Sequence, residues 1–244
     1  VVVMNSRTGE VLAMDGSSNY NSNDKRVAGQ ENMAVLPRQP GSTFKPLVYS
    51  TAFEMGWYPG LVLPDQKTFF PNGASSGTIA DKNHTYVPTD YGNTYHNIAT
   101  SPIRLSTANS FNIPALRALA FTGVDNVVAT AQRMGITNIN QKVAACQKAN
   151  QPLVSCIGTS LALGTTEVSL LQMVNAYQAF ADNGHHVSSQ GILDIWDNYG
   201  HNFYHFDPNH IQSLQVLSPQ ISYMMTSVLT DEASRRLEFE SDHD

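Results

Sequence analysis

The sequence predicts an α/β domain of the α+β type, in which an antiparallel sheet is flanked by helices. Strand-like segments joined by turn residues open the chain and return near residues 191–206, and helical periodicity is clearest over 170–182. A composition of 41% hydrophobic residues in a chain of 244 supports a buried core. Together these observations exclude a disordered protein and favour mixed helix and sheet.

The first predicted element is a β-hairpin. Residues 1–4 and 11–14 are strand-like and are joined by the turn-forming sequence Asn-Ser-Arg-Thr-Gly-Glu. The polar residues 15–31 that follow are expected to form a surface loop. Pro46 then fixes the start of a helix: proline lacks an N–H and is tolerated only in the first turn, so the helix must begin within a few residues of Ser42.

The middle of the chain predicts an irregular excursion followed by helices. Residues 59–101 are rich in Pro, Gly, Asn and Thr without sustained periodicity, so we expect one short strand there at most. Helices are expected over 113–121, with Pro114 in the first turn, and over 124–134.

The clearest predicted helix covers residues 170–182. Ser169 and Gln172 have the spacing of a capping box, and Asn183-Gly184 supplies a stop. Its expected inward face consists of Leu170, Met173, Val174, Tyr177 and Ala181.

A second hairpin and a last helix complete the expected fold. Residues 191–197 and 202–206 alternate like two strands around Asn-Tyr-Gly. The helix is expected to start at Ser218-Pro219. Its expected inward residues are Ile221, Met224, Met225, Val228 and Leu229.

Charge and hydropathy exclude two kinds of function. A net charge of −6 and a pI near 5.7 make nucleic acid an unsuitable partner, since binding needs a basic face. The sequence has no uninterrupted apolar stretch long enough to span a bilayer. Because the chain begins directly inside a strand, we expect a targeting segment upstream.

Cys146 and Cys156 leave two alternatives open. Their spacing excludes a CxxC motif, and two thiols alone make a poor zinc site. They are either two unrelated buried thiols or, in an exported domain, a local disulfide that would stabilise the fold by about 3 kcal/mol.

The segment Ser42-Thr43-Phe44-Lys45 is the strongest candidate for chemistry. On a helix, positions i and i+3 share one face, so Ser42 Oγ and Lys45 Nζ can meet. A serine hydroxyl is a weak nucleophile that needs an adjacent base, and a neutral amine can supply one. Gly41 removes a side chain where a substrate carbonyl would approach. The pattern alone also fits an N-cap serine followed by a surface lysine.

The sequence around these residues resembles a known family. Residues 38–46, Arg-Gln-Pro-Gly-Ser-Thr-Phe-Lys-Pro, resemble the nucleophile segment of penicillin-binding proteins, the serine transpeptidases that cross-link peptidoglycan. Residues 110–112, Ser-Phe-Asn, match that family's S-x-N element. Parts of 162–184 look like a helix that braces the family's site, and 5–14 resemble the first hairpin of its class A members. The resemblance covers nearly the whole chain in the family's order.

The resemblance implies a fold and a role for each site residue. The fold would be that of the β-lactamase and transpeptidase superfamily, an antiparallel sheet flanked by helices with a helical subdomain. Ser42 would attack the carbonyl between the two terminal D-alanines of a stem peptide, and Lys45 would take its proton. Ser110 would relay that proton to the leaving amine, and Asn112 would hydrogen-bond the substrate amide. A β-lactam would acylate the same serine.

The sequence departs from the family pattern in two places. The third motif, Lys-Thr-Gly or Lys-Ser-Gly, is absent, and Lys67-Thr68-Phe69 lies between the first two motifs without the glycine. We therefore expect residues 1–244 to be a transpeptidase domain truncated at both ends. Since the resemblance places one oxyanion donor on the missing strand, we expect residues 1–244 to bind β-lactams poorly or not at all. In addition, Asp90 stands where many family members carry Asn.

The histidines raise a metal-binding alternative, which we weigh against a solvated hairpin. Adjacent histidines point to opposite sides of a strand, and no H-x-x-x-H pair lies on a convincing helix. We therefore expect a solvated hairpin, no metal site and no cofactor. The histidines concerned are His185, His186, His201, His205 and His210.

The function implied is a peptidoglycan D,D-transpeptidase at the extracytoplasmic face of a bacterial membrane. Expected partners are stem peptides, β-lactams, a membrane anchor and a glycosyltransferase domain in the longer protein, with no nucleic acid. A D,D-carboxypeptidase or serine β-lactamase would use the same residues but deliver water to the acyl-enzyme. A penicillin-binding sensor or pseudoenzyme would bind without turnover. The long excursion and the class A-like hairpin favour the transpeptidase.

Overall fold

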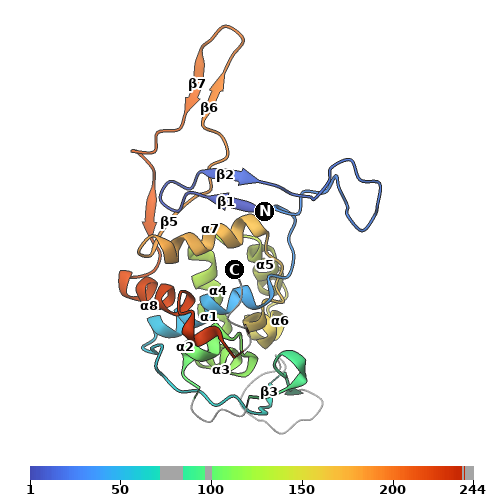
Figure 1. Cartoon of the computed structure of the whole chain (residues 1–244), viewed down its shortest axis with the longest axis vertical. Helices are drawn as coiled ribbons and strands as arrows, with labels where there is room; N and C mark the ends of the chain where they lie inside the picture. Colours follow the sequence, from blue (N-terminus) through green and yellow to red (C-terminus); the bar gives the residue numbers. More distant parts are fainter. Residues whose placement is uncertain (72–84, 97–100, 238, 240–244) are drawn as a thin grey trace.

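The computed structural model describes residues 1–71, 85–96, 101–237 and 239, and places helices and short strands along them (Figure 1). The α-helices are α1 (Lys45–Glu54), α2 (Ile103–Ala108), α3 (Asn112–Thr122), α4 (Val124–Arg133), α5 (Ile139–Lys148), α6 (Leu153–Cys156), α7 (Leu170–Ala181) and α8 (Pro219–Leu229). The 3-10 helices are η1 (Gly41–Phe44), η2 (Tyr91–Asn93), η3 (Thr159–Leu163) and η4 (Ala233–Arg235). The strands are β1 (Val2–Met4), β2 (Val11–Met14), β3 (Phe70–Pro71), β4 (Thr85–Tyr86), β5 (His185–Val187), β6 (Asp194–Trp196), β7 (Asn202–His205) and β8 (Ser213–Gln215).

Helix α1 is the centre of the core. Every residue from Lys45 to Phe53 is buried, as expected for a helix that contacts α3, α4 and α8 on different sides. Two of its polar side chains are satisfied within the helix, because the hydroxyls of Ser50 and Thr51 donate to the carbonyls of Pro46 and Leu47. Pro46 lies in the first turn, so the predicted start of this helix is confirmed.

All the strand pairs among the described residues are antiparallel, as predicted, but they form four two-stranded sheets instead of one. The two predicted hairpins are confirmed as β1–β2 and β6–β7. Strands β5 and β8 pair with each other and were not predicted. The isolated parallel bridge between Glu10 and Gln190 links the first hairpin to the segment that follows β5.

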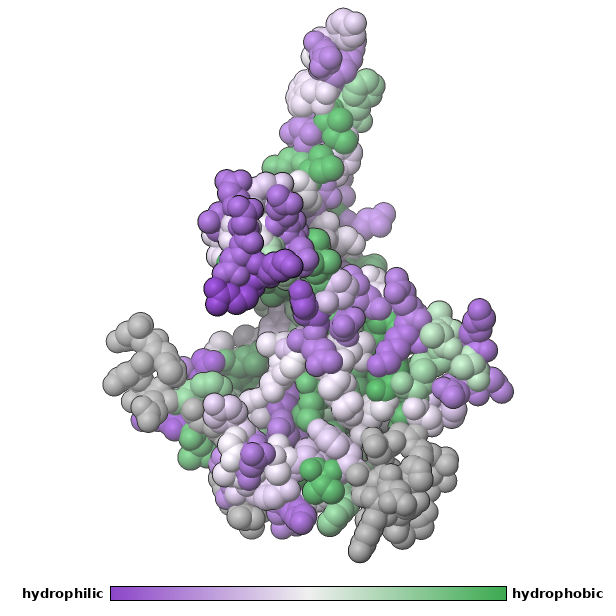
Figure 2. Space-filling model, turned by 90° about the vertical axis from the view of Figure 1, so that its right-hand side faces the viewer, coloured by the Kyte–Doolittle hydropathy of each residue, from purple (hydrophilic) through white to green (hydrophobic). Residues whose placement is uncertain are grey.

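The two hairpins differ in their surroundings. The β1–β2 hairpin lies over α7, whereas β6–β7 projects away from the helical body (Figure 1). Figure 2 shows hydrophobic side chains along this projecting hairpin. Its large exposed hydrophobic residues include Ile195, Trp196, Tyr199, Phe203 and Tyr204.

Helix α7 has nearly the predicted boundaries, and the predicted inward face is confirmed in part: Met173 is buried and Tyr177 packs against the core. Its buried apolar residues are Met173, Ala176, Ala179 and Phe180, while Leu170 and Ala181 are exposed. Apolar residues occur on more than one side of this helix, so helical spacing alone could not identify the side that faces the core. The hydroxyl of Tyr177 donates to the carbonyl of Thr43 at 2.7 Å.

The cap of α7 is half of a capping box. The Ser169 hydroxyl accepts a hydrogen bond from the backbone N–H of Gln172, as predicted. The Gln172 side chain turns away from Ser169, because its amide bonds with Asn138 and Thr137. Asn183 and Gly184 adopt positive φ just after the helix, which explains the predicted stop.

The other expected segments are largely confirmed. Helix α3 covers the region predicted around Pro114, α4 ends one residue before the predicted end, and α8 begins at Pro219. Among its described residues, the region 59–101 carries only the two-residue strands β3 and β4 and the 3-10 helix η2. Residues 72–84 and 97–100 of the predicted excursion lie outside the described residues. The sequence did not predict α2, α5 or α6.

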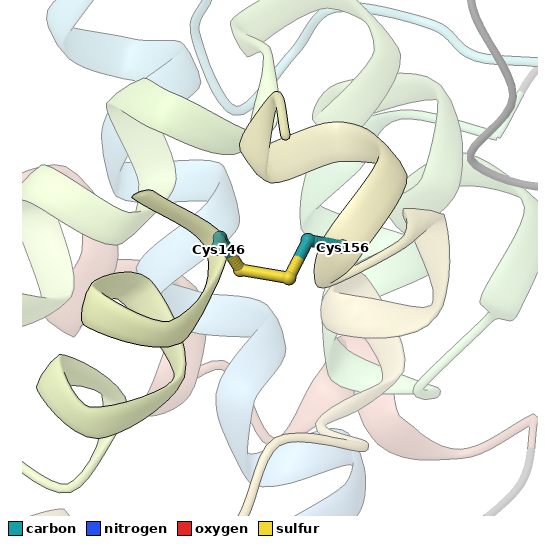
Figure 3. Close-up of a disulfide and its surroundings, with 2 residues drawn as sticks. All are labelled: Cys146 and Cys156. Carbon is teal, nitrogen blue, oxygen red and sulfur yellow. A yellow bond between two sulfur atoms is a disulfide. The ribbon is translucent and has the colours of Figure 1, made fainter. Parts of the chain in front are cut away.

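The two cysteines form a disulfide, which decides between the alternatives left open by the sequence. Cys146 of α5 is bonded to Cys156 of α6, and Figure 3 shows the bond joining the two helices. The bond closes a local loop next to the core, where Cys146 is fully buried.

None of the helices in the described part of the chain combines the length and the apolar composition that a bilayer crossing requires.

Reducing this disulfide should lower the free energy of unfolding by about 3 kcal/mol, the value expected for so short a loop in the chain-entropy model. Denaturant unfolding of the chain with and without reductant measures the loss. A variant carrying both Cys146→Ala and Cys156→Ala serves as the control and should not respond to reductant. A loss below about 1 kcal/mol would show that the bond does not constrain the unfolded chain.

Candidate active site

Three of the four predicted site residues line one cleft. The cleft has a volume of about 510 Å³. Its lining residues are Ser42, Asp90, Tyr91, Asn109, Ser110, Asn112 and Phe239. Lys45, the fourth predicted residue, is only 1% exposed and is bonded to two of these lining residues. The fold therefore brings together residues from the start of α1 and the start of α3.

The amino group of Lys45 joins α1 to the segment that leads into α3. Its Nζ donates hydrogen bonds to Asn112 Oδ1 at 2.7 Å and to Ser110 Oγ at 3.1 Å, and it also donates to the carbonyl oxygen of Ser110. Three acceptors match the three hydrogens of a protonated amine. A neutral amine would keep two of these bonds and present a lone pair in place of the third.

Burial lowers the pKa of Lys45 from its usual 10.5 to about 7. An ammonium group taken out of water loses hydration, so its charged form is disfavoured. The carboxylates of Asp90 and Asp65 oppose this effect and favour the charged form. At neutral pH a substantial fraction of Lys45 therefore carries a lone pair and can serve as a base.

Ser42 presents an exposed hydroxyl at the cleft. It lies in η1, which runs directly into α1, and its carbonyl oxygen accepts a hydrogen bond from the backbone N–H of Lys45. No residue in the described part of the chain forms a hydrogen bond with its hydroxyl. The direct contact with Lys45 Nζ that helical spacing allows is therefore not formed in this state. An exposed hydroxyl without a partner is open to an approaching substrate.

Two glycines meet behind Ser42. Gly41 and Gly164 have φ values of +60° and +68°, in the left-handed region that favours glycine. A Cβ atom on Gly164 would lie 2.1 Å from the carbonyl oxygen of Gly41, and the N–H of Gly41 donates to the Gly164 carbonyl at 3.3 Å. The end of η3 thus braces the turn that carries Ser42. At Gly41 itself a Cβ would meet no atom within 4 Å, so the space beside Ser42 is open.

Ser110 and Asn112 are held by the turn between α2 and α3. Ser110 has a φ of +59°, a conformation that costs a non-glycine residue about 1–3 kcal/mol. The Asn112 side chain uses its oxygen for Lys45 and donates from Nδ2 to the carbonyl of Thr89 at 2.7 Å. Because an amide nitrogen has two hydrogens, one remains for a substrate.

Two buried carboxylates and a histidine lie behind Asn112. Asp90 Oδ1 accepts the backbone N–H of Asn112 at 2.5 Å, and His96 Nδ1 lies 3.2 Å from Asp65 Oδ2 and 3.3 Å from Asp90 Oδ2. Burial raises the pKa of Asp90; the Asn112 N–H opposes this shift and Asp65 adds to it. Sequence reasoning noted Asp90 only as a departure from the family and missed Asp65 and His96. The only sequence signal for this group was that Asp90 stands where many family members carry Asn.

The exposed histidines of the hairpin region have separate aspartate partners. His201, His205 and His210 each place Nδ1 within 2.8 Å of a carboxylate, those of Asp197, Asp194 and Asp207. His185 lies on β5 beside the buried His186, and the two point to opposite sides of the strand, as expected.

Comparison with protein families gives a match over most of the chain. The family described as penicillin binding protein transpeptidase domain matches residues 1–238. The chain is 33% identical over 226 residues to penicillin-binding protein 2D of Bacillus subtilis, covering 92% of this chain and 28% of that protein. It is 28% identical over 233 residues to penicillin-binding protein 1A of Neisseria gonorrhoeae, covering 95% of this chain and 26% of that protein. The chain thus spans little more than a quarter of the length of these relatives.

Solved structures agree with the fold. Penicillin-binding protein 1A from Haemophilus influenzae has a TM-score of 0.71 at 22% identity, over 96% of this chain and 34% of that chain. The imipenem acyl-enzyme complex of penicillin-binding protein A from M. tuberculosis has a TM-score of 0.73 at 17% identity, over 98% of this chain and 57% of that chain. The expected fold class is therefore confirmed.

The contact between the two glycines predicts a stability loss. Gly164→Ala should lower the free energy of unfolding for two reasons. A non-glycine residue at the φ of position 164 is strained by about 1–3 kcal/mol, and the alanine Cβ would overlap the backbone of Gly41. Gly200→Ala, at a φ of +87° with no atom within 4 Å of the added Cβ, controls for strain alone. Denaturant unfolding should show the larger loss for Gly164→Ala. Equal losses would mean that the Gly41 contact does not constrain the Ser42 turn.

Proposed function

We propose that this chain, which belongs to the penicillin-binding protein transpeptidase family, catalyses serine D,D-transpeptidation in peptidoglycan cross-linking. Membership of the family implies peptidoglycan synthesis and β-lactam binding. The observation that carries the finer proposal is the Lys45 amine, buried with a pKa of about 7 beside a cleft at which Ser42 presents a free hydroxyl.

In the first proposed step, Ser42 forms an ester with the substrate. Its Oγ attacks the carbonyl carbon of the amide between the two terminal D-alanines of a stem peptide, and the neutral Lys45 amine accepts the hydroxyl proton. The amide C–N bond breaks, and the proton passes through the Ser110 hydroxyl to the departing nitrogen. The products are an acyl-enzyme at Ser42 and free D-alanine.

In the second proposed step, an amine of a neighbouring stem peptide attacks the ester carbonyl. A new peptide bond forms, the bond to Ser42 Oγ breaks, and the amine proton returns through Lys45 to Oγ. A β-lactam would follow the first step only, with the ring C–N bond as the one that breaks. The bonds from Lys45 to Ser110 support this proton path, because they already join the base to the proposed relay.

Asn112 is proposed to orient the substrate. Its Nδ2 retains a hydrogen beyond the one donated to Thr89, and Asn112 lines the same cleft as Ser42. Because its backbone is held by Asp90 and its side-chain oxygen by Lys45, the amide is positioned before substrate binds.

The proposal extends to the setting of the protein. We place the domain at the extracytoplasmic face of a bacterial membrane, with an anchor and a glycosyltransferase domain in the longer protein. The disulfide supports this location, since such bonds persist in oxidising compartments. The share of the relatives' length that the chain covers leaves room for further domains in those proteins.

Incubation with excess benzylpenicillin should add the mass of one penicilloyl group at Ser42. Intact-protein mass spectrometry followed by peptide mapping makes the measurement. Ser42→Ala should show no adduct, and the exposed Ser155→Ala should react as the unaltered chain does. An adduct that persists in Ser42→Ala would remove this serine from the mechanism.

The rate of acylation should depend on pH through Lys45. A base with a pKa of about 7 must lose its proton before it acts, so the rate should fall about tenfold per pH unit below 7 and level off above it. A rate that still climbs tenfold per unit well above pH 8 would indicate a base with an ordinary lysine pKa.

Lys45→Arg tests the same assignment without removing the charge. Arginine remains protonated at all these pH values, so acylation should be lost. The exposed Lys148→Arg is the matched control and should react normally, and circular dichroism checks that both variants are folded. A folded Lys45→Arg that acylates at the original rate would show that another group is the base.

A further inference from the structure

Asp65, Asp90 and His96 form a compact group of possible metal ligands at the wall of the cleft. One ligand atom from each lies within 4.8 Å of the other two. Asp65 belongs to the loop after α1, while Asp90 and His96 flank η2. The three side chains therefore tie together two segments that the sequence separates.

The distances within this group fit metal coordination as well as a shared hydrogen bond. A neutral imidazole Nδ1 carries at most one hydrogen, yet His96 Nδ1 lies between two carboxylate oxygens at 3.2 and 3.3 Å. Bonds of about 2.0–2.1 Å to a tetrahedral zinc ion place neighbouring ligand atoms about 3.3–3.4 Å apart. Both nitrogen-to-oxygen distances are thus close to the ligand-to-ligand distance in such a tetrahedral site.

The burial of the carboxylates points the same way. Asp65 is 0% exposed and Asp90 is 4% exposed, and buried charges in proteins are normally paired or bound to metals. Asp65 Oδ1 is buried and has no hydrogen-bond partner among the described residues, whereas Asp65 Oδ2 accepts the backbone N–H of His96 at 2.8 Å. A bound cation would compensate both negative charges and could engage this oxygen.

Surrounding residues hold the three side chains in place. The backbone N–H of Asn112 fixes Asp90 through Oδ1, which leaves Oδ2 facing His96. The imidazole stacks on the buried Phe111, with ring centroids 4.0 Å apart. Outer partners of this kind orient the ligands in known metal sites.

We propose that Asp65, Asp90 and His96 bind one divalent transition-metal ion of the zinc type. One imidazole and two carboxylates form a mixed N and O ligand set that suits zinc, and a fourth position can be filled by water. The site is separate from Ser42. The ion would fix the loop carrying Asp90, which in turn holds the backbone of Asn112 at the cleft.

Zinc titration of the chelator-treated chain tests this proposal. In competition with a chromogenic chelator, the chain should bind one zinc ion that Asp65→Asn and His96→Gln each weaken by at least about 10–100-fold, the loss that even an altered outer partner causes. A variant carrying both His201→Gln and His205→Gln is the matched control, since these exposed histidines also lie beside aspartates. It should bind zinc as the unaltered chain does.

A second readout keeps the test independent of activity and of folding losses. Cobalt bound in place of zinc should give the intense visible absorption of a tetrahedral site, and His96→Cys should retain binding and add a thiolate-to-cobalt band. Circular dichroism without metal checks that each variant is folded. The proposal is overturned if the chain binds no zinc, if folded His96→Gln binds as tightly as the unaltered chain, or if only the hairpin variant loses binding.

Discussion

Burial of the Lys45 amine is the constraint on which this site depends. Because α1 is buried from Lys45 to Phe53, the amine at its first turn is shielded from water and finds its partners inside the protein. It finds them in Ser110 and Asn112, so the packing of α1 against α3 fixes the relative positions of base and relay. The same burial lowers the pKa of the amine to about 7, which makes it a usable base at neutral pH.

The residues that would react are held from several directions. The turn that carries Ser42 is braced by Gly164 on one side and by the Tyr177 hydroxyl, which donates to Thr43, on another. Across the cleft, Asp90 and Thr89 hold Asn112. Preorganisation of this kind reduces the reordering that a transition state would otherwise require. The cleft therefore depends on contacts made well outside the two sequence motifs.

Much of the architecture could be predicted because local chemistry decides it. Proline can stand only in a first turn, so Pro46 located the start of α1, and the spacing of Ser42 and Lys45 put both on that start. Which segment would meet Lys45 followed from resemblance to a family, since no local rule relates α1 to Asn112. The disulfide stayed open because spacing alone does not distinguish bonded from free thiols.

Features decided by tertiary contacts were predicted less well. Helix α7 has apolar residues on several sides, so periodicity alone could not identify the buried side. Leu170, which the periodicity assigned to the core, is exposed. Asp65 and His96 carried no signal because polar residues of a long irregular segment become a group only once the chain folds.

The most direct test of the central claim is an NMR titration of lysine labelled at Cε, with the Lys45 signal assigned by its loss in Lys45→Met. A midpoint near 7 is the result that the buried amine predicts, and a midpoint near the ordinary value of 10.5 would contradict it.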